Sequence, residues 1–150
     1  MFKKILLLAC VLMFTNAHAY KKGDTISPSI AKTLRINPSK VTIIDFFASW
    51  CVSCKKELPL MSKLNKRINR SKVEILGVCT DKSLKKGKAF QKKVGINFRV
   101  YNDTKQKVIS AFNPVGMPAT YIVKGGKVLG VLMGAMSKKD RIVEKFVARH

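Results

Sequence analysis

Apolar and polar positions divide the first two thirds of the chain into strand-like and helix-like segments. Residues 41–48 and 73–79 are short apolar runs rich in β-branched side chains, which predicts two buried strands. Between them a helix is predicted from about residue 52 to residue 69, with a kink at Pro59. Its apolar face carries side chains at three- and four-residue spacings: Leu58, Met61, Leu64 and Ile68.

The alternation of strand and helix continues beyond the second strand. Asp81 is a good helix cap, and a helix is predicted from about residue 83 to residue 94, ending near Gly95. Residues 98–101 predict a short strand, and Asp103 can cap a further helix.

The last third of the chain predicts a hairpin and a final helix. Residues 119–123 and 128–133 are β-rich and flank a segment with two adjacent glycines, which predicts antiparallel strands joined by a tight turn. Ser137 opens a segment that resembles a capping box, so a helix should follow it. Residues 20–40 are polar and predict an irregular lead-in, with room for a short hairpin.

The resulting order is βαβαβα followed by ββα. Parallel strands in the first half and a hairpin in the second predict an α/β fold, with a mixed central sheet and helices on both faces. No linker and no repeat interrupts this order, which favours a single domain.

The first 19 residues have the pattern of a secretory signal peptide. Lys3 and Lys4 precede an apolar run over residues 5–14, which is too short to span a bilayer comfortably. Residues 17–19 (AHA) fit a signal-peptidase site, so we expect cleavage after Ala19. The alternative is a buried N-terminal helix. Cleavage leaves a domain of 131 residues, 20–150 (150 − 19), in a periplasmic compartment where disulfides persist.

The chain is strongly basic. It carries a net charge of +22, and the loss of Lys3 and Lys4 leaves +20. Most of this charge is lysine spread over predicted helices and turns, which is typical of a solvated surface. It also allows attraction to an anionic membrane surface or to acidic proteins. Without an arginine-rich tract or a nucleic-acid motif, and with export, we expect no nucleic-acid partner.

Cys51 and Cys54 lie where the first strand gives way to a helix. A helix N-terminus favours a thiolate, so Cys51 is predicted to be the nucleophile and Cys54 the resolving thiol. A structural disulfide and half of a metal site are the alternatives. Zinc usually takes four ligands, and the mature chain offers three cysteines and only His150. Haem attachment would need a histidine where Lys55 stands.

Two other polar or reactive residues have two interpretations each. Asp45 lies in the apolar strand, where a buried carboxyl should have a raised pKa, unless it reaches solvent at the strand end. Cys79 is predicted to be a small buried residue, with a reactive or dimer-forming thiol as the alternative.

Three segments resemble proteins of the thioredoxin fold. Residues 45–51 (DFFASWC) resemble the approach to the active site, and residues 115–120 (VGMPAT) resemble the loop that carries the cis-proline. Residues 55–59 (KKELP) resemble the segment after the dithiol in the exported TlpA/ResA/CcmG group of reductases. The resemblance covers roughly residues 24–148.

This resemblance implies roles for site residues. Asp45 would relay the proton of Cys54, while Trp50, Met117 and the cis-proline Pro118 would form the substrate groove. Asp81 lies near the place of a functional glutamate in ResA-like proteins, although a helix cap is the simpler role.

The resemblance also implies an extracytoplasmic thiol-disulfide oxidoreductase that reduces protein disulfides and needs no cofactor. Apocytochrome c is one candidate substrate, and a membrane-bound protein would donate the electrons. Val52 and Ser53 differ from the residues that more commonly lie between the two cysteines in this family. A disulfide-forming oxidase or an isomerase is therefore the alternative. A non-catalytic binding module and a cationic surface-adhering protein are alternatives of another class.

Overall fold

The computed structural model describes residues 18–135 and 139–149. Its strands are β1 (Val41–Phe47), β2 (Val73–Cys79), β3 (Arg99–Asn102), β4 (Ala119–Lys124) and β5 (Lys127–Met133). Its helices are α1 (Pro28–Thr33), α2 (Val52–Arg67), α3 (Leu84–Val94), α4 (Lys107–Phe112) and α5 (Lys139–Ala148). None of the helices within these described residues combines the length and the apolar character that crossing a membrane requires.

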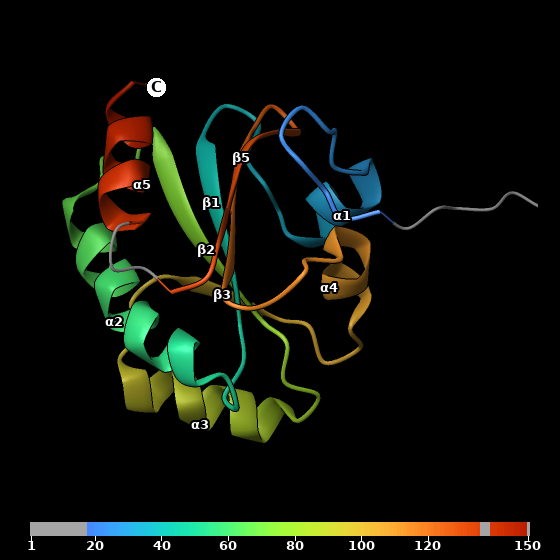
Figure 1. Ribbon diagram of the computed structural model, residues 1–150, viewed down its shortest axis with the longest axis vertical. Helices are drawn as coiled ribbons and strands as arrows, with labels where there is room; N and C mark the ends of the chain where they lie inside the picture. Colours follow the sequence, from blue (N-terminus) through green and yellow to red (C-terminus); the bar gives the residue numbers. More distant parts are fainter. Residues whose placement is uncertain (1–17, 136–138, 150) are drawn as a thin grey trace, which may run out of the picture.

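The strands form one mixed sheet in the order β3-β2-β1-β4-β5. β1, β2 and β3 are parallel, whereas β4 is antiparallel to β1 and β5 is antiparallel to β4. Figure 1 shows α2, α3 and α5 on one face of the sheet and α1 and α4 on the other. This is the predicted α/β architecture, and it is the thioredoxin fold.

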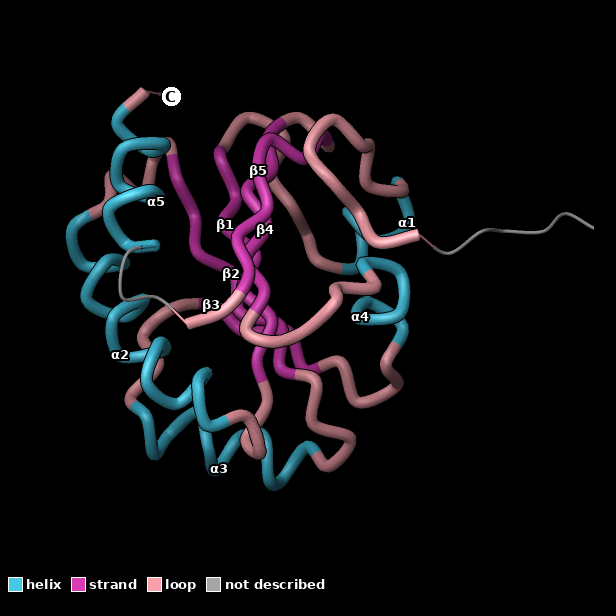
Figure 2. The backbone as a smooth tube through the Cα atoms, viewed as in Figure 1, coloured by secondary structure: helices cyan, strands magenta, loops and turns pink. Residues whose placement is uncertain are grey.

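Strand β1 lies at the centre of the molecule (Figure 2). All seven of its residues are buried, because it is paired on both edges and covered on both faces. Successive side chains of a strand point to opposite faces. Ile44 and Phe46 therefore pack under α1 and α4, and Asp45 shares the α2 face with Ile43 and Phe47.

The hairpin and the helix ends follow the predicted turn chemistry. Gly125 and Gly126 both have positive φ, at 57° and 78°, and they join β4 to β5 where the sequence predicts the turn. Gly95 ends α3 in the left-handed conformation. Asp103 accepts a hydrogen bond from the backbone N–H of Ile109 at 2.8 Å and so caps α4 from just outside it.

The lead-in differs from its prediction. Residues 20–40 contain helix α1, which Ser27 caps by accepting a bond from the N–H of Ile30, with Pro28 in the first turn. In place of a local hairpin, Thr25 forms an isolated antiparallel bridge with Lys127. The predicted capping box at Ser137 and the proposed signal peptide, apart from its last two residues, lie outside the described residues.

Candidate active site

The cysteine pair lies at the N-terminus of α2, directly after β1. Cys51 and Cys54 form a disulfide with a Cα–Cα distance of 5.2 Å. Cys51 is the N-cap of α2, and its sulfur accepts a hydrogen bond from the backbone N–H of Cys54 at 3.2 Å. Cys51 keeps 7% of its surface exposed, whereas Cys54 has none. Of the two cysteines, only Cys51 is therefore open at all to an incoming thiol or disulfide.

The surface beside the disulfide contains the predicted groove residues. Trp50 is 68% exposed, which excludes a core-packing role. The peptide bond between Met117 and Pro118 is cis, and Met117 packs against the apolar cluster that holds both cysteines. A pocket of about 510 Å³ runs between Trp50 and Met117 and is bordered by Lys82 and Lys86.

Asp81 organises the loop in front of the cysteines. One of its carboxylate oxygens accepts a bond from the backbone N–H of Ser49 at 2.8 Å, and the other accepts one from the Ser49 hydroxyl at 2.6 Å. The predicted capping role of Asp81 is wrong, because Ser83 is the N-cap of α3. Asp81 instead fixes the segment that leads into Trp50 and Cys51.

Asp45 is fully buried in the middle of β1, which excludes the alternative that it reaches solvent. The Thr120 hydroxyl donates a hydrogen bond to its Oδ1 at 2.8 Å, whereas Oδ2 has no hydrogen-bond partner among the described residues. Burial raises the pKa of Asp45 from 3.8 to about 6, against the opposing effects of Thr120 and the Lys139 charge. The carboxyl can thus gain or lose a proton near neutral pH.

Two further ionisable side chains join Asp45, and the sequence analysis missed both. Glu57, on α2, is 1% exposed, and burial followed by the charge of Asp45 raises its pKa to about 8. Lys139, the first residue of α5, is 6% exposed, and its Nζ lies 3.8 Å from Oε1 of Glu57. Burial lowers the pKa of Lys139, against the attraction of the two carboxylates.

A sequence signal existed for Glu57 but not for Lys139. Glu57 comes three residues after Cys54, one helical turn along, and beside Leu58 on the apolar face of α2. An acidic residue on that face should be buried. Lys139 is one of 30 basic residues, and only its position in the fold sets it apart.

Cys79 is the one free cysteine among the described residues, and it is buried at the end of β2. Its thiol donates a hydrogen bond to Oδ2 of Asp81 at 3.3 Å. Burial raises the pKa of this thiol to about 11, so it stays protonated at neutral pH. These features favour the packing role over a reactive or dimer-forming one.

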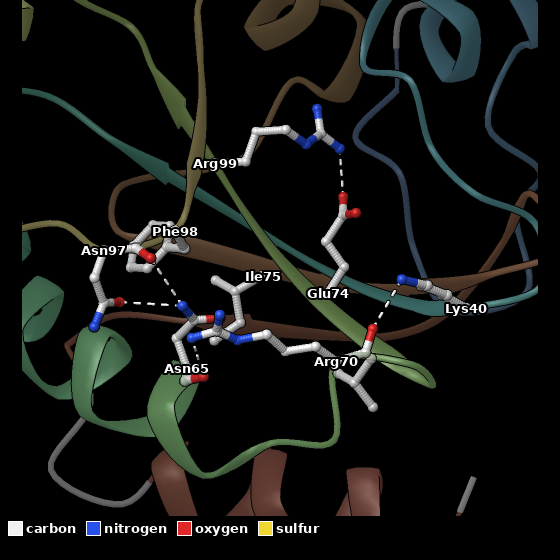
Figure 3. A pocket seen from close by; sticks show the side chains of 9 residues that line it. Lys40, Asn65, Arg70, Glu74, Ile75, Asn97, Phe98 and Arg99 are labelled. Atoms are coloured by element: carbon white, nitrogen blue, oxygen red, sulfur yellow. Dashed lines mark hydrogen bonds and ion pairs between the residues drawn. The ribbon is translucent and has the colours of Figure 1, made fainter.

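A second pocket, of about 260 Å³, lies at the opposite end of the sheet (Figure 3). It opens where β1, β2 and β3 begin, far along these strands from the cysteines. Its charged groups bind within the protein: Arg99 pairs with Glu74, and Lys40 donates to the carbonyl of Arg70 at 2.8 Å. This internal pairing is consistent with a structural role.

The chain matches known proteins over most of its length. Residues 21–131 match the model of the AhpC/TSA family. The thiol-disulfide oxidoreductase ResA of Geobacillus thermodenitrificans is 27% identical over 135 residues, which cover 85% of this chain and 78% of that protein. ResA of Bacillus subtilis is 34% identical over 100 residues, or 66% of this chain and 56% of that protein.

Solved structures give the same result. A thiol:disulfide interchange protein of the thioredoxin family from Chlorobium tepidum superposes with a TM-score of 0.63 at 26% identity, covering 85% of this chain and 97% of that one. A second protein from Chlorobium tepidum, assigned as a thiol:disulfide interchange protein DsbE, gives a TM-score of 0.74 over 88% of this chain and 98% of its own, at 21% identity. In this structure Cys51 and Cys54 form a disulfide at the start of α2, and the chain belongs to the AhpC/TSA family.

Proposed function

We propose that this protein is an exported thiol-disulfide oxidoreductase that reduces disulfides in other proteins. The observation that carries the proposal is the asymmetry of the cysteine pair: Cys51, at a helix N-terminus, keeps 7% of its surface exposed, and Cys54 behind it is fully buried. The shared name of the ResA relatives supports this activity.

The reaction runs in two thiol exchanges. The thiolate of reduced Cys51 attacks one sulfur of a substrate disulfide, and the other substrate sulfur leaves as a thiolate that takes up a proton. Cys54 then loses its proton and attacks the sulfur of Cys51, which releases the second substrate thiol. Two electrons pass to the substrate, and the Cys51–Cys54 disulfide remains. A membrane-bound donor of two electrons would regenerate the dithiol.

Asp45 is the proposed acceptor for the proton of Cys54. Its carboxyl lies under the helix that carries Cys54, out of contact with solvent, and titrates near neutral pH. Glu57, one turn from Cys54 on the same helix, keeps its own proton up to about pH 8, which leaves Asp45 as the acceptor at neutral pH. Asp45 would thus let the buried thiol of Cys54 ionise without access to water.

The substrate groove is proposed at Trp50, Met117 and Pro118. An extended segment of the substrate can pair with the backbone of Met117, as a strand added beside the active site. Trp50 supplies an exposed flat surface next to Cys51. Apocytochrome c, with its pair of nearby cysteines, is a candidate substrate of the kind this groove would accept.

Export is proposed with cleavage after Ala19, on the pattern of residues 1–19. The test is N-terminal sequencing of the protein recovered from outside the cytoplasm of an expressing bacterium. We expect Tyr20 as the first residue. Recovery of the intact chain only from the cytoplasm would overturn the proposal of export.

The direction of the reaction is tested by the reduction potential of the cysteine pair in glutathione or dithiothreitol buffers. Trp50 is the single tryptophan and reports the redox state by its fluorescence. We expect a value near that of thioredoxin, about −270 mV, which suits a reductase. A value near about −120 mV would identify an oxidant that donates disulfides. The Cys79→Ser variant is the control, because this buried thiol should leave the potential unchanged.

A further inference from the structure

Three ionisable side chains from separate elements meet in the layer between the sheet and helices α2 and α5. Asp45 comes from β1, Glu57 from α2 and Lys139 from α5, and all three are buried. Helices α2 and α5 pack against each other, as Figure 1 shows. The group is thus assembled from positions that span almost a hundred residues of sequence.

These three side chains form few hydrogen bonds. Both carboxylate oxygens of Glu57, Oδ2 of Asp45 and Nζ of Lys139 have no hydrogen-bond partner among the described residues. Buried charges are costly unless they are paired. The 3.8 Å between Lys139 and Glu57 is an ion-pair distance too long for a hydrogen bond. The arrangement therefore depends on the charge of Lys139 more than on any directional contact.

Among the described residues, the other polar or redox groups that face these three side chains carry no charge. β4 contributes the Thr120 hydroxyl, which is neutral, and α2 contributes the Cys51–Cys54 disulfide at its N-terminus. The nearest ion pair between α2 and α5, Arg67 with Glu144, lies on the surface with both side chains substantially exposed. Among the described buried residues of this layer, Lys139 is the one cation beside two acids.

We propose that Lys139 is a positioning residue of the active site: its ammonium keeps one of the two buried carboxyls ionised, so that a proton acceptor stands ready beneath Cys54. With Lys139 present, the group holds one proton on Glu57 and one negative charge on Asp45 at neutral pH. Without the cation, burial drives both carboxyls to the neutral form. A neutral pair cannot accept the proton that Cys54 must lose.

This inference deepens the proposed function and rests on it. The experiment compares the wild-type protein with Lys139→Met, which keeps the side-chain length and removes the charge, and with Lys139→Arg, which keeps the charge. Lys63→Met on the exposed face of α2 is the matched control. Each reduced protein is mixed with oxidised glutathione from about pH 5 to about pH 10, and Trp50 fluorescence follows closure of the disulfide.

We expect Lys139→Met to move the pH of half-maximal rate upward. For each unit of that shift, the rate at a pH below both midpoints falls about tenfold. Lys139→Arg and Lys63→Met should follow the wild-type profile. A folded Lys139→Met with the wild-type profile would overturn the inference, while wild-type protein that fails to exchange at all would overturn the proposed function instead.

A second variant keeps the inference testable if Lys139→Met does not fold. Lys139→Gln also removes the charge but keeps a polar end group, so the pH of half-maximal rate should again move upward. A folded Lys139→Gln variant with the wild-type profile would show that the charge of residue 139 does not act on the proton acceptor, and the inference would fail.

Discussion

At the scale of single residues, Asp45 sets a pH dependence of stability. Burial raises its pKa to about 6, so the folded chain holds this proton more tightly than the unfolded chain does. Burial of this carboxyl therefore does not lower the free energy of unfolding below about pH 4. Between about pH 4 and about pH 6 it lowers that free energy increasingly, by roughly 3 kcal/mol in all. Burial of Glu57 also lowers the free energy of unfolding as the pH rises, and this effect continues to about pH 8.

Asp45→Asn removes the contribution of this carboxyl. We expect the variant to unfold at higher urea concentration than the wild type at about pH 7, with a smaller loss of stability between about pH 4 and pH 6. Glu144→Gln, on the surface of α5, is the control and should leave that pH dependence in place. An Asp45→Asn variant with the wild-type pH dependence would assign the proton uptake to another group.

The residues of the site differ in how far they could be predicted. Cys51, Cys54 and Asp45 stand out because each is chemically unusual for its place in the local pattern. The local pattern predicted a capping role for Asp81. Its actual partner, Ser49, is 32 residues away, and a local pattern does not encode that contact. Lys139 reaches the site only through the packing of α5 on α2, which no local pattern encodes.

At the scale of elements, the packing of α3 on β2 depends on Gly87. A Cβ at Gly87 would lie 2.9 Å from the sulfur of Cys79, closer than real contacts allow. Alanine improves helix propensity by about 1 kcal/mol, but overpacking costs about 1–3 kcal/mol. We therefore expect Gly87→Ala to lower the free energy of unfolding in urea.

The Gly87→Ala/Cys79→Ala double variant tests the cause, because it removes the sulfur that the new methyl group meets. We expect the double variant to lose less stability than the sum of the two single variants, with a positive coupling in the mutant cycle. Lys85→Ala on the exposed face of α3 is the control for helix propensity. Strict additivity of the two changes would contradict this account of the packing.

The elements themselves were largely predictable because most bury a continuous apolar face. The five strands and helices α2, α3, α4 and α5 follow the periodicity of apolar residues. The hairpin follows its two glycines. Helix α1 was not predicted because none of its six residues is buried, and it therefore shows no apolar periodicity. Its only local signal is Ser27 followed by Pro28, a cap and first-turn pair.

At the scale of the whole molecule, the surface is even more basic than the composition indicates. Four of the eight acidic residues are buried: Asp45, Glu57, Asp81 and Asp103. The outer surface thus presents most of the 30 lysines and arginines against few carboxylates. This excess supports the proposed attraction to anionic membranes.

We expect the protein to bind vesicles that contain phosphatidylglycerol and not vesicles of phosphatidylcholine alone. The binding should weaken strongly between about 0.05 M and about 0.5 M salt, because salt screens exposed charges. The Cys51→Ser/Cys54→Ser variant should bind equally well in a sedimentation assay. Binding that ignores salt, or that needs the cysteines, would contradict an electrostatic origin.

Because half of the acidic residues are buried, acid affects the surface charge and the active site differently. Lysine and arginine ordinarily keep their protons up to about pH 10, so a surface made mostly of them carries a nearly constant charge between about pH 5 and pH 9. The electrophoretic mobility of the native protein should hardly change across this interval. Asp45 and Glu57, whose pKa values burial raises into this interval, are enclosed between the sheet and α2. Acidification of the surroundings would therefore alter the rate of thiol exchange while the surface charge, and with it the expected binding to anionic vesicles, stays nearly constant.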